Sequence, residues 1–279
     1  MTLRSPETHA ACALWPGDRW WGPRRRRAAL RPLKNMPRYT PGGIDLGAWL
    51  LAFVDGPSTY FAFRAIFDEG VYDFPPPAGR APRIIDGGAN VGLAIRYWLS
   101  RFDAPRITAF EADASVFGVL KSNVEAWTPA APEVVLHQAA LWTDNTSLNF
   151  VQEGADAGHV DAAGDTPVSE GASRVSAVRL RDVLEAETGP VDLLKLDIEG
   201  AETAVVKDCQ NHLGAVRRLF VEHHGYVDRP QDLHVLLQTL SDAGFRYHVQ
   251  PELVGKRPFF GLPSHAGMDQ RVNVFAFRP

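Results

Sequence analysis

Apolar positions from residue 83 onward alternate between the spacing of strands and the spacing of helices. Stripes such as Val116, Leu120 and Val124 predict helices, and short apolar runs between them predict strands. The expected strands span 83–88, 106–113, 133–141, 147–152, 174–180, 191–198, 216–224, 245–250 and 271–279. The expected helices span 91–102, 114–127, 199–209 and 230–244. This alternation predicts an α/β fold: a mostly parallel sheet with helices on both faces, closed by two antiparallel strands.

The segment before this pattern reads as a cap. Residues 44–74 show a rough 3–4 spacing of apolar positions, which residues 55–58 break into two expected helices. Ser58 or Thr59 is the expected cap of the second helix. Residues 75–82 are rich in proline and predict a stiff linker.

The start of the chain is irregular and holds four consecutive arginines at 24–27. A nucleic-acid or anionic-lipid arm is one interpretation, and a solvated or tryptophan-packed tail is the one we favour. The expected units are a tail over 1–38, a helical cap over 39–82 and the main domain over 83–279.

Composition narrows the class of protein. Of 279 residues, 45% are hydrophobic and 22% charged, and the formal net charge is −4. The acidic balance argues against a basic surface for nucleic acid or an anionic membrane. Cys12 and Cys209 lie far apart, which favours free thiols in a cytoplasmic protein. No apolar run approaches the ~20 residues of a membrane span, and the sequence leaves the oligomeric state open.

The first strand of the main domain ends in a glycine loop, DGGANVG, over 86–92. Ligands of parallel sheets bind beyond the carboxyl ends of the strands, so strand ends are the candidate site. Glycines let the backbone approach a ligand, and the N-terminus of the following helix faces it. The spacing is not G-x-G-x-x-G, and Asp86 would repel a pyrophosphate, so a ligand with a positive charge or an amine is favoured over a dinucleotide.

The next two strand ends carry candidate nucleoside contacts. Glu111 ends the second strand, where an acid can accept both hydroxyls of a ribose. Asp113 is the expected cap of the next helix. Past the third strand, Ala140 and Trp142 are expected beside a base whose amino group Asp144 accepts. The alternatives are a core role for Trp142 and an ordinary turn at Asp144.

The fourth strand ends in charged residues. Alternation places Lys195, Asp197 and Glu199 on one face of an otherwise apolar strand. Buried charges are costly unless they are paired or used, so they predict either an internal ion-pair network or a catalytic or metal-binding cluster. Glu202, at the start of the next helix, could complete that cluster.

The fifth strand ends in Glu222, His223 and His224. An imidazole that is neutral near pH 7 can take a proton from a hydroxyl. Adjacent residues of a strand face opposite ways, so we expect one histidine in the site, and the sequence leaves open which one.

Together these strand ends resemble the FkbM family of S-adenosylmethionine-dependent methyltransferases. The segment IIDGGANVGLA is similar to the family's D-x-G-A-N-x-G loop, and AFEAD to its F-E-P/A-D strand end. LLKLDIEGAE is similar to its K-x-D-x-E-G-x-E signature, and VEHHG to its E-x-H segment. The resemblance covers about residues 40–279.

The resemblance implies a Rossmann-like class I methyltransferase fold with a seven-stranded sheet, the last strands antiparallel. It implies methyl transfer from S-adenosylmethionine to a hydroxyl oxygen of a sugar, polyketide or other natural product. It assigns the methionine part of the cofactor to Asp86, Gly88, Asn90 and Gly92, the ribose to Glu111, and the sulfonium and acceptor to Asp197.

On this basis His223 or His224 is the expected base, and Lys195, Asp197 and Glu222 are expected to position the acceptor. A divalent metal held by Asp197 and Glu222 is a variant that we do not favour. The loop over 153–173 matches no motif and is a candidate wall of the acceptor pocket.

Three rival functions share some of these features. A nucleic-acid methyltransferase conflicts with the acidic chain and with the lack of an N/D-P-P-Y motif. A nucleotide-dependent oxidoreductase conflicts with Asp86 and the loop spacing. A non-catalytic protein that kept the cofactor fold is opposed by the intact charged strand end.

Overall fold

The computed structural model describes residues 23–47, 49–128, 133–151, 159–160 and 172–278. The expected irregular tail lies outside these residues up to position 22, but its end is ordered. The arginine run belongs to helix α1 (Pro23–Leu30), which a 3₁₀ turn, η1 (Arg31–Asn35), follows. The prediction of a tail is wrong here because Leu30 and Leu33 are buried in the core, which anchors both helices.

The cap differs from its prediction at one element. Residues expected to form its first helix form an antiparallel hairpin, β1 (Gly42–Asp45) and β2 (Leu50–Phe53). Asp45 accepts a hydrogen bond from the Gly47 amide at the turn, and Leu51 and Phe53 alternate into the core.

The second helix of the cap is confirmed as α2 (Gly56–Phe63), continued by a π turn, η2 (Arg64–Asp68). The N-cap residue of α2 is Asp55 and not Ser58 or Thr59, because the Asp55 side chain accepts a hydrogen bond from the Ser58 amide at 2.8 Å.

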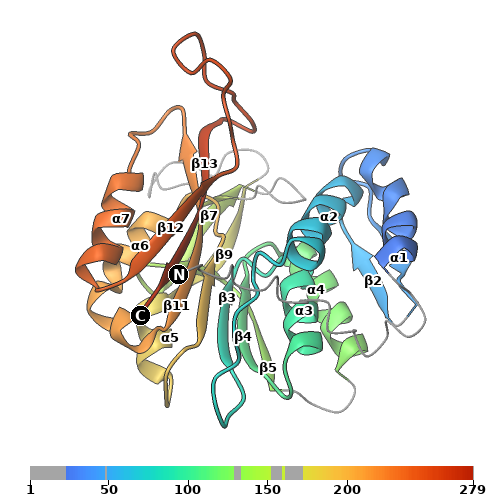
Figure 1. The fold of residues 1–279 in the computed structure, drawn as a ribbon, viewed down its shortest axis with the longest axis horizontal. Helices are drawn as coiled ribbons and strands as arrows, with labels where there is room; N and C mark the ends of the chain where they lie inside the picture. Colours follow the sequence, from blue (N-terminus) through green and yellow to red (C-terminus); the bar gives the residue numbers. More distant parts are fainter. Residues whose placement is uncertain (1–22, 48, 129–132, 152–158, 161–171, 279) are drawn as a thin grey trace, which may run out of the picture.

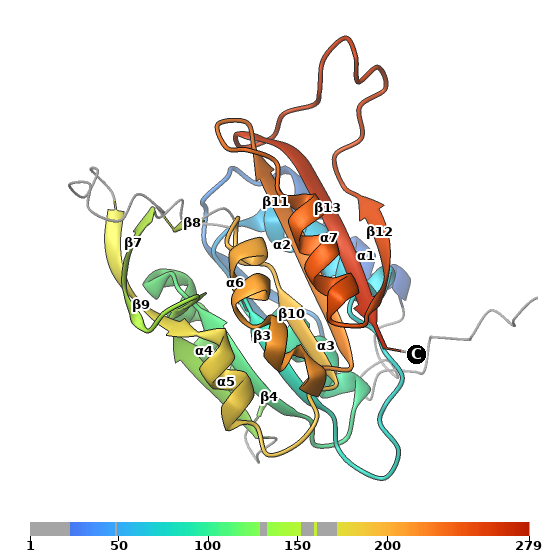
Figure 2. The same cartoon turned by 90° about the vertical axis from the view of Figure 1, so that its left-hand side faces the viewer.

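The central sheet has seven strands in the order β12-β13-β11-β10-β3-β4-β5 (Figures 1 and 2). Five strands are parallel, and β13 pairs antiparallel with both β11 and β12. Their bounds are β3 (Arg83–Gly87), β4 (Arg106–Glu111), β5 (Val134–Gln138), β10 (Leu193–Leu196), β11 (Arg218–Tyr226), β12 (Arg246–Pro251) and β13 (Met268–Phe277). The strand order reverses between β3 and β10, so a ligand site is expected at their carboxyl ends.

Helices cover both faces of this sheet, as predicted (Figure 1). One core packs under α3 (Leu93–Arg101), α4 (Ala114–Trp127) and the cap. The other packs under α5 (Leu180–Ala186), α6 (Glu202–Asp208), the 3₁₀ turn η3 (Gln210–Ala215) and α7 (Leu233–Asp242). None of the described helices is long and apolar enough to cross a membrane.

A second, four-stranded sheet lies beside the carboxyl end of β5. Its order is β6 (Ala140–Trp142), β9 (Ala172–Arg179), β7 (Thr146–Val151) and β8 (His159–Val160). The strand expected over 133–141 is therefore two strands that belong to different sheets. Most of the loop expected over 153–173 lies outside the described residues.

Candidate active site

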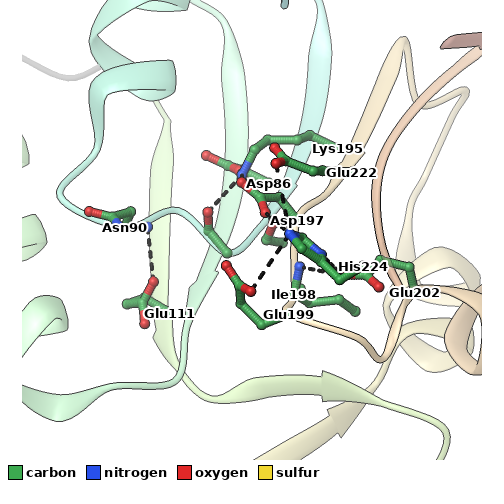
Figure 3. Close-up of polar contacts among 12 residues, drawn as sticks. Asp86, Asn90, Glu111, Lys195, Asp197, Ile198, Glu199, Glu202, Glu222 and His224 are labelled. Atoms are coloured by element: carbon green, nitrogen blue, oxygen red, sulfur yellow. Dashed lines mark hydrogen bonds and ion pairs between the residues drawn. The ribbon is translucent and has the colours of Figure 1, made fainter. Parts of the chain in front are cut away.

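The carboxyl ends of β3, β4, β10 and β11 open on one cavity of about 1100 Å³. Each strand end contributes to its wall, through Gly88, Glu111, Asp197 and His224 respectively. The cap closes the opposite side with residues such as Phe61 and Tyr72. Figure 3 shows the Asn90–Glu111 pair on one side of the site and the charged cluster around His224 on the other.

Position 88 of the glycine loop must be glycine, because its backbone contacts the backbone of Asp197. Gly88 has a φ of 76°, and a Cβ added there would lie 1.8 Å from the carbonyl oxygen of Asp197. The loop after β3 is thus pressed against the loop after β10, where no L side chain fits. Asn90 also has a positive φ and, with Gly88, lines the cavity.

Gly92 and Asp86 do not line the cavity, although the sequence predicts that both contact the cofactor. Gly92 begins α3 away from the cavity, with Leu120 and Trp127 where a side chain would be. Asp86 is fully buried behind the loop and is not part of the cavity wall. The structure therefore places Asp86 and Gly92 in support of the glycine loop and not in the cavity wall.

Lys195 stabilises the glycine loop by hydrogen bonds to its backbone. Its buried ammonium donates to the carbonyl oxygens of Gly88 at 2.6 Å and Gly87 at 3.2 Å. Nζ also lies 3.1 Å from Asp86 Oδ1, an ion pair without hydrogen-bond geometry, and 3.7 Å from Asp197 Oδ2. Burial lowers the pKa of Lys195, but Asp86 and Asp197 outweigh it and raise that pKa overall. The ammonium stays charged and holds the end of β3 to the end of β10.

Glu111 joins the glycine loop to the end of β4. One carboxylate oxygen accepts from the Asn90 amide and the other from the Asp113 amide, both at 2.9 Å. Burial raises the pKa of Glu111 to about 7, against these hydrogen bonds. Asp113 caps α4, as predicted, by accepting from the amides of Ser115 and Val116. The Glu111 carboxylate therefore faces the cavity in a fixed position.

The side of the cavity expected to hold a base is apolar. Ala139, Ala140, Leu141 and Phe110 line it. Trp142 is not part of the wall and packs between the small sheet and the core under α6. The expectation for Trp142 is corrected because the chain leaves the central sheet after β5 and continues as β6 of the four-stranded sheet. Trp142 has the alternative core role there, and Asp144 is not part of the cavity wall either.

The charged cluster at the carboxyl ends of β10 and β11 is centred on His224. Its Nδ1 lies 3.0 Å from Glu202, a buried carboxylate that also accepts from the amides of Ile198 and Gly200. Its Nε2 faces three carboxylate oxygens at 3.6 to 3.9 Å, from Glu199, Glu222 and Asp197. Glu202 thus fixes the ring, and Nε2 remains directed at the cavity.

These carboxylates control the charge of the imidazole. Burial lowers the pKa of His224, but Glu199 and Glu202 outweigh it and raise that pKa well above its ordinary value. Burial also raises the pKa of Glu222 to about 7, with repulsion from Asp197 adding to it. Burial raises the pKa of Glu199 well above its ordinary value too, so four carboxyl groups compete with the imidazole for protons at this end of the cavity.

His223 points to the opposite face of β11, where its Nε2 lies 2.8 Å from Asp232, just before α7. It does not line the cavity. Of the two histidines between which the sequence left a choice, the structure places His224 in the site.

A cation could be held at this end of the cavity. One ligand atom from each of Asp197, Glu199 and His224 lies within 4.8 Å of the others. The pair expected from the sequence was Asp197 with Glu222, but Glu222 Oε1 lies 3.3 Å from the guanidinium of Arg271, so it is already paired.

Tyr72 is a site residue that sequence reasoning missed. It follows η2 in the cap, is buried, and its ring lies 5.7 Å from the Lys195 ammonium. Burial, with Asp197 and Glu222 nearby, raises the pKa of its phenol well above the ordinary value, so it stays neutral. No motif marks this tyrosine, because only the folding of the cap over the sheet brings it there.

Comparison with known proteins agrees with this geometry. A family model described as the Methyltransferase FkbM domain matches residues 86–247. Methyltransferase sdnD of Sordaria araneosa is 30% identical over 217 residues, which cover 66% of this chain and 81% of that protein. Methyltransferase 1 of Beauveria bassiana is 24% identical over 210 residues, 68% of this chain and 82% of its own.

A solved structure of Methyltransferase FkbM from Methylobacillus flagellatus aligns with a TM-score of 0.48 and 14% identity. The alignment covers 91% of this chain and 59% of that longer one. The family model covers more than half of the chain and contains each strand end that forms the site. The protein therefore belongs to the FkbM family and is an S-adenosylmethionine-dependent methyltransferase of the class I fold.

Proposed function

We propose that this protein transfers the methyl group to a hydroxyl oxygen of a small molecule, such as a sugar, a polyketide or another natural product. The observation that carries the proposal is His224, whose Nε2 faces the cavity while Glu202 holds Nδ1. A hydroxyl must lose its proton as its oxygen takes the methyl, so it needs a base at this point. An amine acceptor is nucleophilic when neutral and has less need of one.

The described residues fit the cofactor. Glu111 offers a fixed carboxylate for the ribose hydroxyls, and Ala140 belongs to an apolar wall suited to adenine. Gly88 and Asn90 present loop backbone to the methionine part. Asp197 and its neighbouring carboxylates supply the negative charge that a sulfonium requires.

When bound, the cofactor supplies a methyl group on a positively charged sulfur. His224 begins as an imidazolium, because Glu199 and Glu202 raise its pKa. A second positive charge in the same cluster lowers that pKa, so Nε2 loses its proton and becomes a base. His224 then takes the proton of the acceptor hydroxyl, so the sulfur and the imidazole together would carry one positive charge before and after methyl transfer.

Incubation with methyl-labelled cofactor and hydroxyl-bearing acceptors of these classes tests the proposal. We expect a labelled methyl ether, identified by mass spectrometry and NMR. Label on nitrogen or carbon would contradict the assignment to oxygen.

Chelation separates the histidine base from a metal-assisted route. Proton removal by His224 needs no cation, so we expect turnover to be unchanged in a strong chelator. Loss of turnover on chelation, restored by a divalent cation, would instead assign Asp197, Glu199 and His224 as ligands.

A further inference from the structure

The loop between β12 and β13, residues 252–267, extends beyond the rest of the molecule at the top of Figure 1. It carries four exposed large apolar side chains, Val254, Phe259, Phe260 and Leu262. Phe259 and Phe260 are 101% and 89% exposed. Two adjacent phenylalanines almost fully exposed to water at the end of a projection indicate a surface that is covered in use.

The loop is fixed at its base. The Glu252 amide donates to the Arg271 carbonyl, and the backbones of His265 and Met268 exchange hydrogen bonds. The Val227 amide, from the turn after β11, donates to the Gly267 carbonyl. Higher up, a Cβ on Gly255 would lie 3.1 Å from Pro263, so the two arms run side by side. The sheet therefore presents the phenylalanines as a defined projection.

The charge next to the phenylalanines is positive. Lys256 and Arg257 immediately precede Pro258 and the two rings, while the chain as a whole carries a net charge of −4. The acid of the loop, Glu252, lies at its base and accepts from Asn273. Aromatic side chains flanked by basic ones match a bilayer with anionic headgroups, in which rings enter the acyl boundary and cations remain at the phosphates.

We propose that the β12–β13 loop inserts Phe259 and Phe260 into an anionic membrane surface. The same loop borders the cavity through Leu253, Ser264 and His265. Insertion would therefore bring the cavity to the bilayer, which suits an amphiphilic hydroxyl acceptor taken from the membrane. This statement about the acceptor rests on the proposed function, whereas membrane binding itself does not.

Co-sedimentation of the full chain with vesicles tests the insertion. We expect binding to vesicles of phosphatidylcholine with phosphatidylglycerol, weaker binding to phosphatidylcholine alone, and a decrease with added salt. The F259S/F260S double variant should lower the partition coefficient by about tenfold or more. K256Q/R257Q should remove the preference for anionic vesicles.

The matched control is L50S, which removes an exposed apolar side chain from β2, outside the loop. It should bind vesicles as the wild type does. The proposal is overturned if F259S/F260S binds like wild type, or if the wild type stays in the supernatant with both kinds of vesicle. The latter result would leave a lid or a protein-docking role for the loop.

Binding of S-adenosylhomocysteine without vesicles keeps the two proposals apart. Phe259 and Phe260 do not line the cavity, so both loop variants should bind it as the wild type does. A failure of methyl transfer to oxygen in the labelling experiment would leave the vesicle result standing, and a failure of vesicle binding would leave the methyl transfer standing.

Discussion

His224 is the side chain on which the proposed proton transfer depends. We expect H224Q to lower kcat by about 10²- to 10⁴-fold, the usual contribution of a general base. Affinity for S-adenosylhomocysteine should change little, because Glu111 and the glycine loop are untouched. Steady-state kinetics and calorimetry measure the two effects.

The matched control is H223Q, at the neighbouring position on the opposite face of β11. It should keep its turnover, although losing the contact with Asp232 lowers stability. Equal losses of kcat in the two variants would show that His224 acts only through the fold.

Glu111 predicts a pH dependence of cofactor binding. Its pKa is raised to about 7, and only the ionised form can accept from both ribose hydroxyls while it holds two amides. Affinity for S-adenosylhomocysteine should fall as pH drops below 7, by up to about tenfold per pH unit. Calorimetric titration across this range measures the dissociation constant.

The contribution of Glu111 to folding stability should depend on pH in the opposite sense to its effect on cofactor affinity. The unfolded chain loses this proton near the ordinary glutamate pKa of 4.5, whereas the folded protein keeps it up to about 7. Between these values the folded state binds more protons, so the contribution of Glu111 to stability falls as pH rises. The E111Q variant should lose both pH dependences of the wild type, that of cofactor affinity and that of stability. If the variant keeps the wild-type dependence of affinity on pH, another group controls binding.

Of the contacts between elements, the one between the loops after β3 and β10 leaves the least space for a side chain. In G88A the new Cβ would overlap the Asp197 carbonyl at a positive φ. We expect a loss of about 2–4 kcal/mol in the free energy of unfolding, together with loss of cofactor binding. Denaturant unfolding and calorimetry measure these changes.

G79A separates the steric effect from the backbone conformation. Gly79 has a φ of 71°, close to that of Gly88, but nothing lies within 4 Å of an added Cβ. It should lose only about 1 kcal/mol and retain cofactor binding. Equal destabilisation in both variants would mean that the loops can separate freely.

The hairpin of the cap shows what local patterns cannot predict. Apolar residues at Leu46, Trp49, Leu50 and Phe53 match a helical spacing, yet β2 is a strand. Its partners come from α4: Asn123 accepts from and donates to Ala52 at 2.9 Å, and the Trp127 indole donates to the Leu50 carbonyl at 2.8 Å. These hydrogen bonds join positions more than 70 residues apart, and so only the tertiary fold selects the strand.

In the whole molecule, the central sheet and its carboxyl-end site could be predicted because the strands that lead to the site, β3, β4, β10 and β11, are mostly apolar and end in chemically distinctive residues. The sequence pattern predicted Glu111, Lys195, Asp197 and one of the two histidines at one edge, and the structure has the first three and His224 there. It could not separate residues that line the cavity from those that support it. Asp86 and Gly92 belong to the second group because of packing beneath the loop, which no spacing encodes.

The proposed proton transfer requires that a positive charge entering the carboxylate cluster displace the proton of His224. Calorimetry in two buffers of different ionisation enthalpy measures the protons released on binding. S-adenosylmethionine carries a positive sulfur and S-adenosylhomocysteine does not, so we expect greater proton release with the first, and loss of this difference in H224Q. Equal release with the two ligands, or a difference that survives in H224Q, would contradict it.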